Sequence, residues 1–136
     1  MRIAIILDHL DDLKPHKDTS LAIMREAEKR GHQLFVAMQG DVILRHEKVR
    51  ILAKPFAFSD GDAWYKLGDM TESAAADFDV VLMRKDPPFD NEFLYSTYLL
   101  DLAEKQGARV LNHPVSVRDW NEKLDRKSTR LNSSHG

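Results

Sequence analysis

The chain has 136 residues, 43% hydrophobic and 31% charged, which is enough apolar side chain for the core of one domain. Its 20 Lys and Arg against 22 Asp and Glu leave a formal charge of −2, which argues against a protein held to nucleic acid or to an anionic membrane by charge. There is no cysteine, which excludes disulfides, cysteine-ligated metal sites and thiol catalysis. The first apolar run, Ile3 to Leu7, is too short for a signal peptide or a membrane span, so we expect a cytoplasmic protein.

The first forty residues have the pattern of a βαβ unit. Residues 3–7 are apolar at every position, which predicts a strand covered on both faces. A helix is expected to begin at Asp18 or Thr19, whose side chains can cap its first turn, and to end at Gly31. Its predicted apolar face consists of Leu21, Met24 and Ala27. Residues 34–38 then predict a second strand, joined to the first by a right-handed crossover.

The middle of the chain is less regular. Residues 41–45 and 48–57 alternate loosely and predict a hairpin or a small flap with His46 and Glu47 between its strands. Residues 59–70 are mostly polar and are expected to form a short helix or a loop. Residues 71–78 are expected to add another short helix.

The pattern becomes regular again after residue 79. Val80 to Met83 predicts a buried strand, residues 91–106 a long helix that stops at Gly107, and residues 109–111 a further strand. Alternating strands and helices of this length indicate an α/β fold with a mainly parallel sheet flanked by helices.

The end of the chain differs from the rest in composition. A short helix is expected after Pro114, where Ser116 and Asp119 have the spacing of a capping box. Residues 125–136 contain one large apolar side chain, so we expect a disordered tail after a domain of residues 1–124.

Charged side chains follow the buried strands, and in open α/β sheets ligands bind outside the carboxyl ends of the strands. Arg84, Lys85 and Asp86 follow the Val80 strand. A guanidinium can hold a carboxylate bidentately, a lysine adds a positive charge and an aspartate can accept from an ammonium. These three residues therefore form a candidate binding site for a zwitterionic amino acid or peptide. The alternative is a solvated turn with one ion pair inside the loop.

The segment Lys17-Asp18-Thr19-Ser20 could bind an anion through its amides and hydroxyls at a helix start, although plain capping explains the same residues. Asp8, Asp11 and Asp12 are compatible with a metal or phospho-acceptor pocket, or with solvated loop carboxylates. The histidines show no metal-ligand spacing. No glycine-rich phosphate loop and no nucleophile elbow is present. The residues alone thus indicate an α/β domain that is compatible with binding a small charged molecule.

One longer motif is more specific. The run Leu82-Met83-Arg84-Lys85-Asp86-Pro87-Pro88-Phe89-Asp90 resembles the signature stretch of the N-terminal domain of bacterial glutathione synthetase. Residues 17–24 are similar to the first helix of that family. Asn112-x-Pro114 and Asn121-Glu122-Lys123-Leu124 resemble its exit from the domain. The resemblance covers residues 1–124 in the family's order, with Asp8-His9 where the family usually has Asp-Pro.

The resemblance implies a Rossmann-like pre-ATP-grasp domain from a ligase that joins γ-glutamylcysteine to glycine. In that family ATP phosphorylates the cysteinyl carboxylate and the glycine amine attacks the acyl phosphate, with Mg²⁺ offsetting the phosphate charge. The residues expected to bind substrate are Arg84, Lys85, Asp86, Asp18, Thr19 and Ser20. The resemblance implies that ATP and Mg²⁺ are bound by an ATP-grasp domain that follows in the family, and we expect this chain to lack that domain. We therefore expect a substrate-binding portion without catalytic residues that is inactive alone. The resemblance also implies assembly into a homo-oligomer, as in the family.

Two other functions stay open from the sequence. One is a stand-alone, non-catalytic module that binds a small charged peptide through the same loops. The other is a receiver-like phospho-acceptor domain that uses Asp8.

Overall fold

The computed structural model describes residues 1–7, 10, 19–84 and 91–111. The expected helix after Pro114 and the expected tail at 125–136 lie outside these residues. The elements in chain order are β1 (Arg2–Ile6), α1 (Thr19–Lys29), β2 (Gln33–Ala37), the short 3₁₀ helix η2 (Gln39–Asp41), β3 (Val42–Arg45), β4 (Lys48–Phe58), β5 (Tyr65–Leu67), β6 (Thr71–Ala74), the 3₁₀ helix η3 (Ala75–Asp77), β7 (Val80–Met83), α2 (Asn91–Lys105) and β8 (Val110–Leu111).

The sheet has the strand order β3-β4-β2-β1-β7-β8, with β5 and β6 also paired to β4. β1 lies between β2 and β7 and is parallel to both, and β7 is parallel to β8. β4 runs antiparallel to β2, β3, β5 and β6. The expectation of a mainly parallel sheet is therefore wrong: the sheet is mixed. The physical reason is that a two-residue turn joins β3 to β4, and such a turn joins only antiparallel strands.

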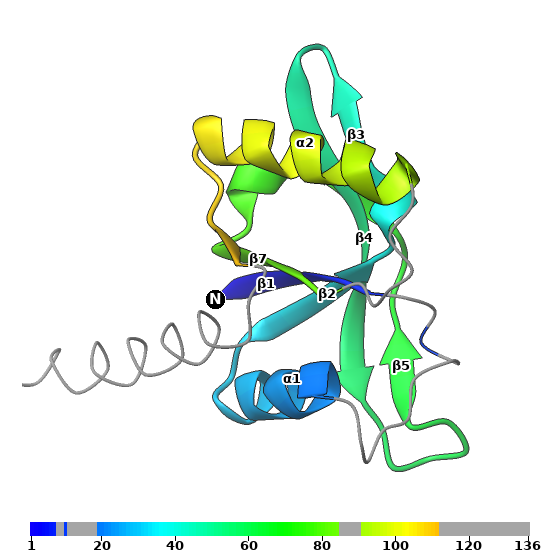
Figure 1. Cartoon of the computed structure of the whole chain (residues 1–136). Coiled ribbons are helices and arrows are strands. Elements are labelled where there is room, and N and C mark those ends of the chain that lie inside the picture. The colour runs from blue at the N-terminus through cyan, green and yellow to red at the C-terminus, as the bar shows by residue number, and fades with distance from the viewer. Residues whose placement is uncertain (8–9, 11–18, 85–90, 112–136) are drawn as a thin grey trace, which may run out of the picture.

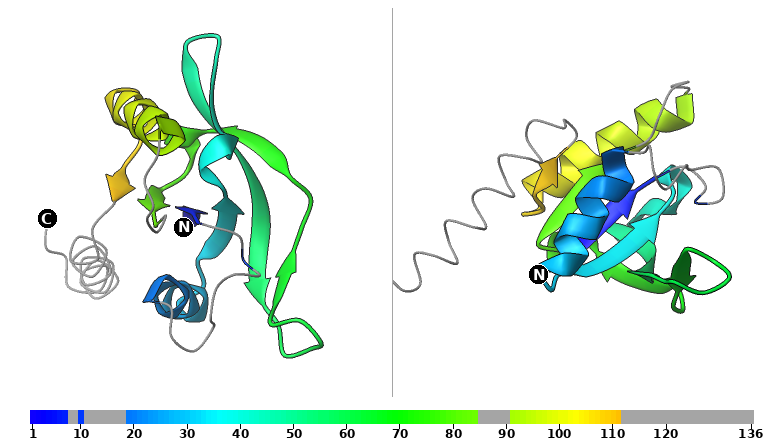
Figure 2. Two further views of the ribbon diagram at one scale, coloured as in Figure 1. Left: turned by 45° about the vertical axis from the view of Figure 1, so that its right-hand side comes forward. Right: turned by 90° about the horizontal axis from the view of Figure 1, so that it is seen from below.

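The two helices cover opposite faces of the sheet, with α1 below and α2 above it in Figure 1. Figure 2 shows how β4 and its partners curl around one side of the molecule. Within the described residues, neither helix is long and apolar enough to cross a membrane.

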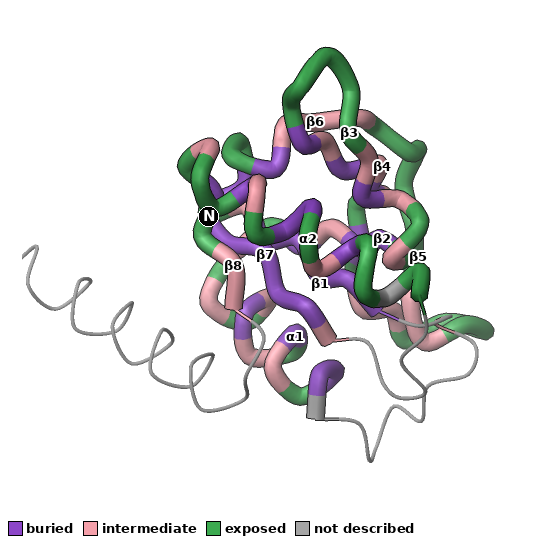
Figure 3. Tube along the Cα trace, turned by 45° about the horizontal axis from the view of Figure 1, so that its top comes forward, coloured by how far each residue is buried: buried purple, intermediate pink, exposed green. Residues whose placement is uncertain are grey.

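Each helix packs on its own apolar cluster. Leu21, Met24 and Ala27 of α1 are buried, as predicted, against one face of the sheet. Leu99, Leu100 and Ala103 of α2 pack on the other face. β1 and β7 supply side chains to both clusters, which is why their sequences are apolar at consecutive positions. Their traces are buried nearly throughout (Figure 3).

Both helices end at a glycine, as the sequence predicts. Gly31 has a φ of 86° and Gly107 a φ of 105°, in the region that favours glycine. After α1, the amide of Gly31 donates to the Glu28 carbonyl and that of His32 donates to the Ala27 carbonyl. The same pair of bonds closes α2, so the two turns are Schellman motifs.

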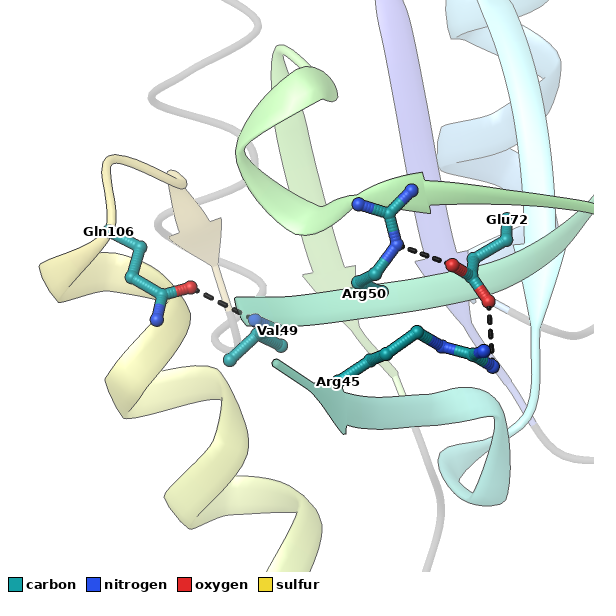
Figure 4. A network of polar contacts seen from close by, with 5 residues as sticks. All are labelled: Arg45, Val49, Arg50, Glu72 and Gln106. Atoms are coloured by element: carbon teal, nitrogen blue, oxygen red, sulfur yellow. Dashed lines mark hydrogen bonds and ion pairs between the residues drawn. The ribbon is translucent and has the colours of Figure 1, made fainter. Parts of the chain in front are cut away.

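The predicted hairpin forms from β3 and β4, which project at the top of Figure 1. His46 and Glu47 at its turn have φ values of 51° and 65°, the conformation that a two-residue hairpin turn requires. The carboxamide of Gln106 accepts from the Val49 amide at 3.0 Å and donates to the Glu47 carbonyl at 2.7 Å. The hairpin is thus tied to the C-terminal end of α2 (Figure 4).

Two expectations for the middle of the chain, a short helix or loop at 59–70 and a short helix at 71–78, were wrong in part. Residues 59–70 contain β5, which pairs with the end of β4, and residues 71–78 contain β6 followed by η3. The extra strands form because β4 has eleven residues and offers its second edge to both. Aromatic contacts support this corner of the sheet: Trp64 and Tyr65 contact each other and Phe56.

Candidate functional site

The carboxyl ends of the parallel strands meet at one edge of the sheet. Past the end of β1, the Leu7 amide donates to the Ala37 carbonyl of β2 at 2.9 Å. Past the end of β7, the Arg84 amide donates to the Ile6 carbonyl of β1 at 2.9 Å. The backbone at the start of the charged loop is therefore fixed by the central strand.

At this edge, two of the predicted site residues come together. The Nε of Arg84 donates to the Oγ of Ser20 at 2.8 Å, although 64 residues separate them in sequence. Ser20 lies in the first turn of α1 and is 5% exposed. Arg84 is half-buried and lies one residue beyond β7. The serine thus fixes the Nε side of the guanidinium from the protein interior.

This contact determines what the guanidinium can do. Ser20 occupies Nε, and within the described part of the chain no other side chain bonds to the Arg84 guanidinium. The remaining edge, formed by the two terminal nitrogens, has the fork geometry that matches a carboxylate or a phosphate. An arginine that is anchored on one side loses less conformational entropy when it binds an anion on the other.

The other predicted residues are less completely placed. Thr19 is the first residue of α1, which agrees with the expected helix start. Asp18, Lys85 and Asp86 lie outside the described residues, so their predicted substrate contacts are untested. Asp8, with the phospho-acceptor hypothesis that depends on it, also lies outside them.

The described histidines lie apart. His46 is in the exposed hairpin turn, and His32 follows α1, where its Nδ1 lies 3.2 Å from the Met1 ammonium. Burial is the main cause that lowers the pKa of His32, the Met1 ammonium and Arg30 lower it further, and Asp79 opposes them. Among the described residues, no group of three or more His, Asp or Glu could hold a metal ion.

Sequence reasoning missed a second feature at the same edge. A pocket of about 310 Å³ lies at the carboxyl ends of β1 and β2 and is walled by β4 and β5. Neither Arg84 nor Ser20 lines it. The signal that could have found its outer wall is the alternation Tyr65-Lys66-Leu67 before Gly68, which is typical of a short strand.

Comparison with known proteins agrees with the resemblance in the sequence. Residues 1–118 match the family model described as prokaryotic glutathione synthetase, N-terminal domain. The chain is 52% identical over 128 residues to the glutathione synthetase of Nitrosomonas europaea, 46% over 125 residues to that of Ralstonia nicotianae and 41% over 125 residues to that of Salmonella typhi. Each alignment covers 91% of this chain but 39–40% of the relative, so the chain spans about two fifths of the length of these proteins. With a family model matched over most of its length, the chain belongs to the family of prokaryotic glutathione synthetase N-terminal domains.

Proposed function

We propose that this chain is the portion of a glutathione synthetase that holds γ-glutamylcysteine, with Arg84 as its main anion-binding residue. The observation that carries the proposal is the hydrogen bond from Arg84 to the buried Ser20. It orients a guanidinium at the sheet edge where α/β domains bind ligands. The sequence on either side of Arg84 is the family's signature stretch, and the matched family supports glutathione synthesis.

The chemistry of the ligand fits this arrangement. γ-Glutamylcysteine carries two carboxylates and one ammonium. Arg84 holds one carboxylate through its terminal nitrogens, Lys85 adds positive charge, and Asp86 accepts from the ammonium. We also propose that Thr19, the first residue of α1, and the preceding Asp18 contact the ligand. Because Ser20 is 5% exposed, its role is to position Arg84 rather than to touch the ligand.

We propose that ATP and Mg²⁺ bind outside the residues of this chain. The relatives extend well beyond the length that this chain covers. We assign the nucleotide and the metal to that additional length, and we expect this chain alone to make no glutathione from γ-glutamylcysteine, glycine, ATP and Mg²⁺.

The parallel strands β2-β1-β7-β8, with helices on both faces, support a Rossmann-like pre-ATP-grasp domain at the centre of the mixed sheet. Assembly into a homo-oligomer and a cytoplasmic location are further parts of the proposal.

Isothermal titration calorimetry with γ-glutamylcysteine tests the binding role. We expect saturable binding that weakens at least about tenfold in Arg84→Ala, since a charge-assisted bidentate contact is lost. Arg84→Lys should recover only part of the affinity, because lysine lacks the fork. Arg109→Ala, an exposed arginine before β8, is the matched control and should bind as the unaltered chain does.

Absence of binding at millimolar concentration, or equal affinity in Arg84→Ala and Arg109→Ala, would overturn the proposal. Production of glutathione by the purified chain would refute the assignment of ATP and Mg²⁺ to the additional length. Binding without turnover fits both a ligase portion and the stand-alone module. Restored synthesis on mixing with the remaining portion of a relative such as the Nitrosomonas europaea protein would favour the ligase.

A further inference from the structure

The pocket of about 310 Å³ beside β2 has its own chemistry, separate from that of Arg84. Its floor is formed by the ends of the two parallel strands, where Leu7 and Val36 are 2% and 8% exposed. Its outer wall comes from β5 and from the segment that follows. The volume lies at the lower end of the roughly 300–1,000 Å³ found for small-molecule pockets.

The rim of the pocket is apolar. Met38, Leu67 and Met70 line it and are 41%, 39% and 47% exposed. They are three of the eight large hydrophobic side chains that are exposed in the described part of the chain. Apolar side chains that gather around one hollow offer a surface that an apolar body could remove from water.

Of the described residues that line the pocket, Asp41 and Lys54 carry charge, and they differ in their hydrogen bonding. The Asp41 carboxylate accepts from the Met38 amide at 2.9 Å and so holds the turn of η2. Lys54, opposite Val36 in the pairing of β4 with β2, makes no hydrogen bond or ion pair within the described residues. Within the described lining, the Lys54 ammonium is therefore available to pair with a ligand.

We propose that this pocket binds a small organic anion with an apolar body, its anionic group paired with the ammonium of Lys54 and its body packed against Leu67 and Met70. Because the pocket combines an ammonium with apolar walls, it favours a ligand that carries both an anionic group and an apolar body. A small hydrophilic anion gains nothing from the walls, and a neutral apolar molecule leaves the ammonium without a partner. Because neither Arg84 nor Ser20 lines this pocket, we expect its ligand to bind independently of γ-glutamylcysteine.

The test uses 3-phenylpropionate as the probe and compares it with two relatives of the same shape or charge. 3-Phenylpropionamide keeps the apolar body without the charge, and propionate keeps the charge without the ring. Titration of the unaltered chain, followed by calorimetry and by NMR of the methionine methyl groups, should show the carboxylate binding at least about tenfold more tightly than either relative, as expected for a charge-assisted contact.

Two lysine variants locate the charge. Lys54→Gln should bring the affinity for 3-phenylpropionate down to that for the amide. Lys66→Gln is the matched control, since Lys66 lies between Tyr65 and Leu67 on β5 and projects to the opposite face of the strand. It should bind as the unaltered chain does, and so should Arg84→Ala, which separates this site from the proposed substrate site.

The proposal is overturned if the unaltered chain shows no saturable binding of 3-phenylpropionate at millimolar concentration, or if it binds the acid and the amide equally. It is also overturned if Lys66→Gln or Arg84→Ala weakens binding as much as Lys54→Gln does. The acid–amide comparison needs no variant, so a folding defect in Lys54→Gln would not remove the test.

Discussion

The hydroxyl of Ser20 and the guanidinium of Arg84 are joined by a 2.8 Å hydrogen bond between the first turn of α1 and the end of β7. The bond links two segments that the sequence pattern predicted as separate candidate sites. One is the start of a helix and the other is a charged loop. Because Ser20 is buried, the bond also makes the orientation of Arg84 depend on the packing of α1.

Ser20→Ala tests this dependence. Loss of the acceptor should let the guanidinium rotate, and affinity for γ-glutamylcysteine should fall by about three- to tenfold, the size of a lost hydrogen bond. In the Arg84→Ala background the same change should have no further effect, since coupled residues are not additive. Calorimetry on the four chains of this cycle gives the coupling. Additive losses would show that Ser20 acts independently of Arg84.

Gln106 tests how the hairpin is held. Gln106→Ala removes the acceptor of the Val49 amide and the donor to the Glu47 carbonyl. The first of these contacts is partly buried, so we expect a loss of about 1–3 kcal/mol in the free energy of unfolding. Urea denaturation measures it. The exposed neighbour Lys105 serves as the control, because Lys105→Ala should change the unfolding free energy far less. Equal losses would contradict a specific role for the carboxamide.

Glu72 lies between two arginines, with Arg50 at 2.6 Å and Arg45 at 3.0 Å (Figure 4). These side chains are 27–55% exposed, so solvent screens the pairs. Glu72→Gln should therefore destabilise the chain by less than about 1 kcal/mol, and by less still in about 0.5 M NaCl. Asp69→Asn, at an exposed residue of the same segment, is the control. A loss that is large and independent of salt would indicate a structural role beyond charge.

His32 predicts a pH dependence of stability. Its pKa in the folded chain is lowered from 6.5, mainly by burial, so the unfolded chain binds this proton more readily. The contribution of the neutral ring is present above pH 6.5 and is lost as the pH falls through the folded pKa. Protonation also removes the ring acceptor next to the Met1 ammonium. Urea midpoints measured between pH 8 and pH 5 should fall less steeply in His32→Gln than in the unaltered chain. Identical slopes would contradict the assignment.

Strong local signals made much of the fold predictable. Residues 3–7 and 80–83 are apolar at every position because both faces of these central strands are covered. Gly31 and Gly107 marked the helix ends because only glycine adopts their conformation cheaply. The hairpin turn at His46 and Glu47 was also expected in its observed place.

The antiparallel half of the sheet was harder to predict. β5 and β6 have three and four residues and few apolar side chains, so they form by pairing with β4 rather than by their own propensity. Their residue types predicted Arg84 and Ser20 as substrate-binding residues. Only the folded chain shows that the two side chains form a hydrogen bond with each other. Lys54 gave no local signal, because its setting depends on strands that are distant in sequence.

One strand, β4, pairs with four other strands of the sheet. Hydrogen bonds from its eleven residues reach β2, β3, β5 and β6, so none of these four can detach without exposing amides of the same backbone. Amide protons in the middle of β4, where it pairs on both edges, should consequently be among the slowest of the described residues to be replaced by deuterium. A substitution that breaks the pairing at one end of β4 should therefore also lower amide protection at the other end, and exchange in such a variant measures this effect.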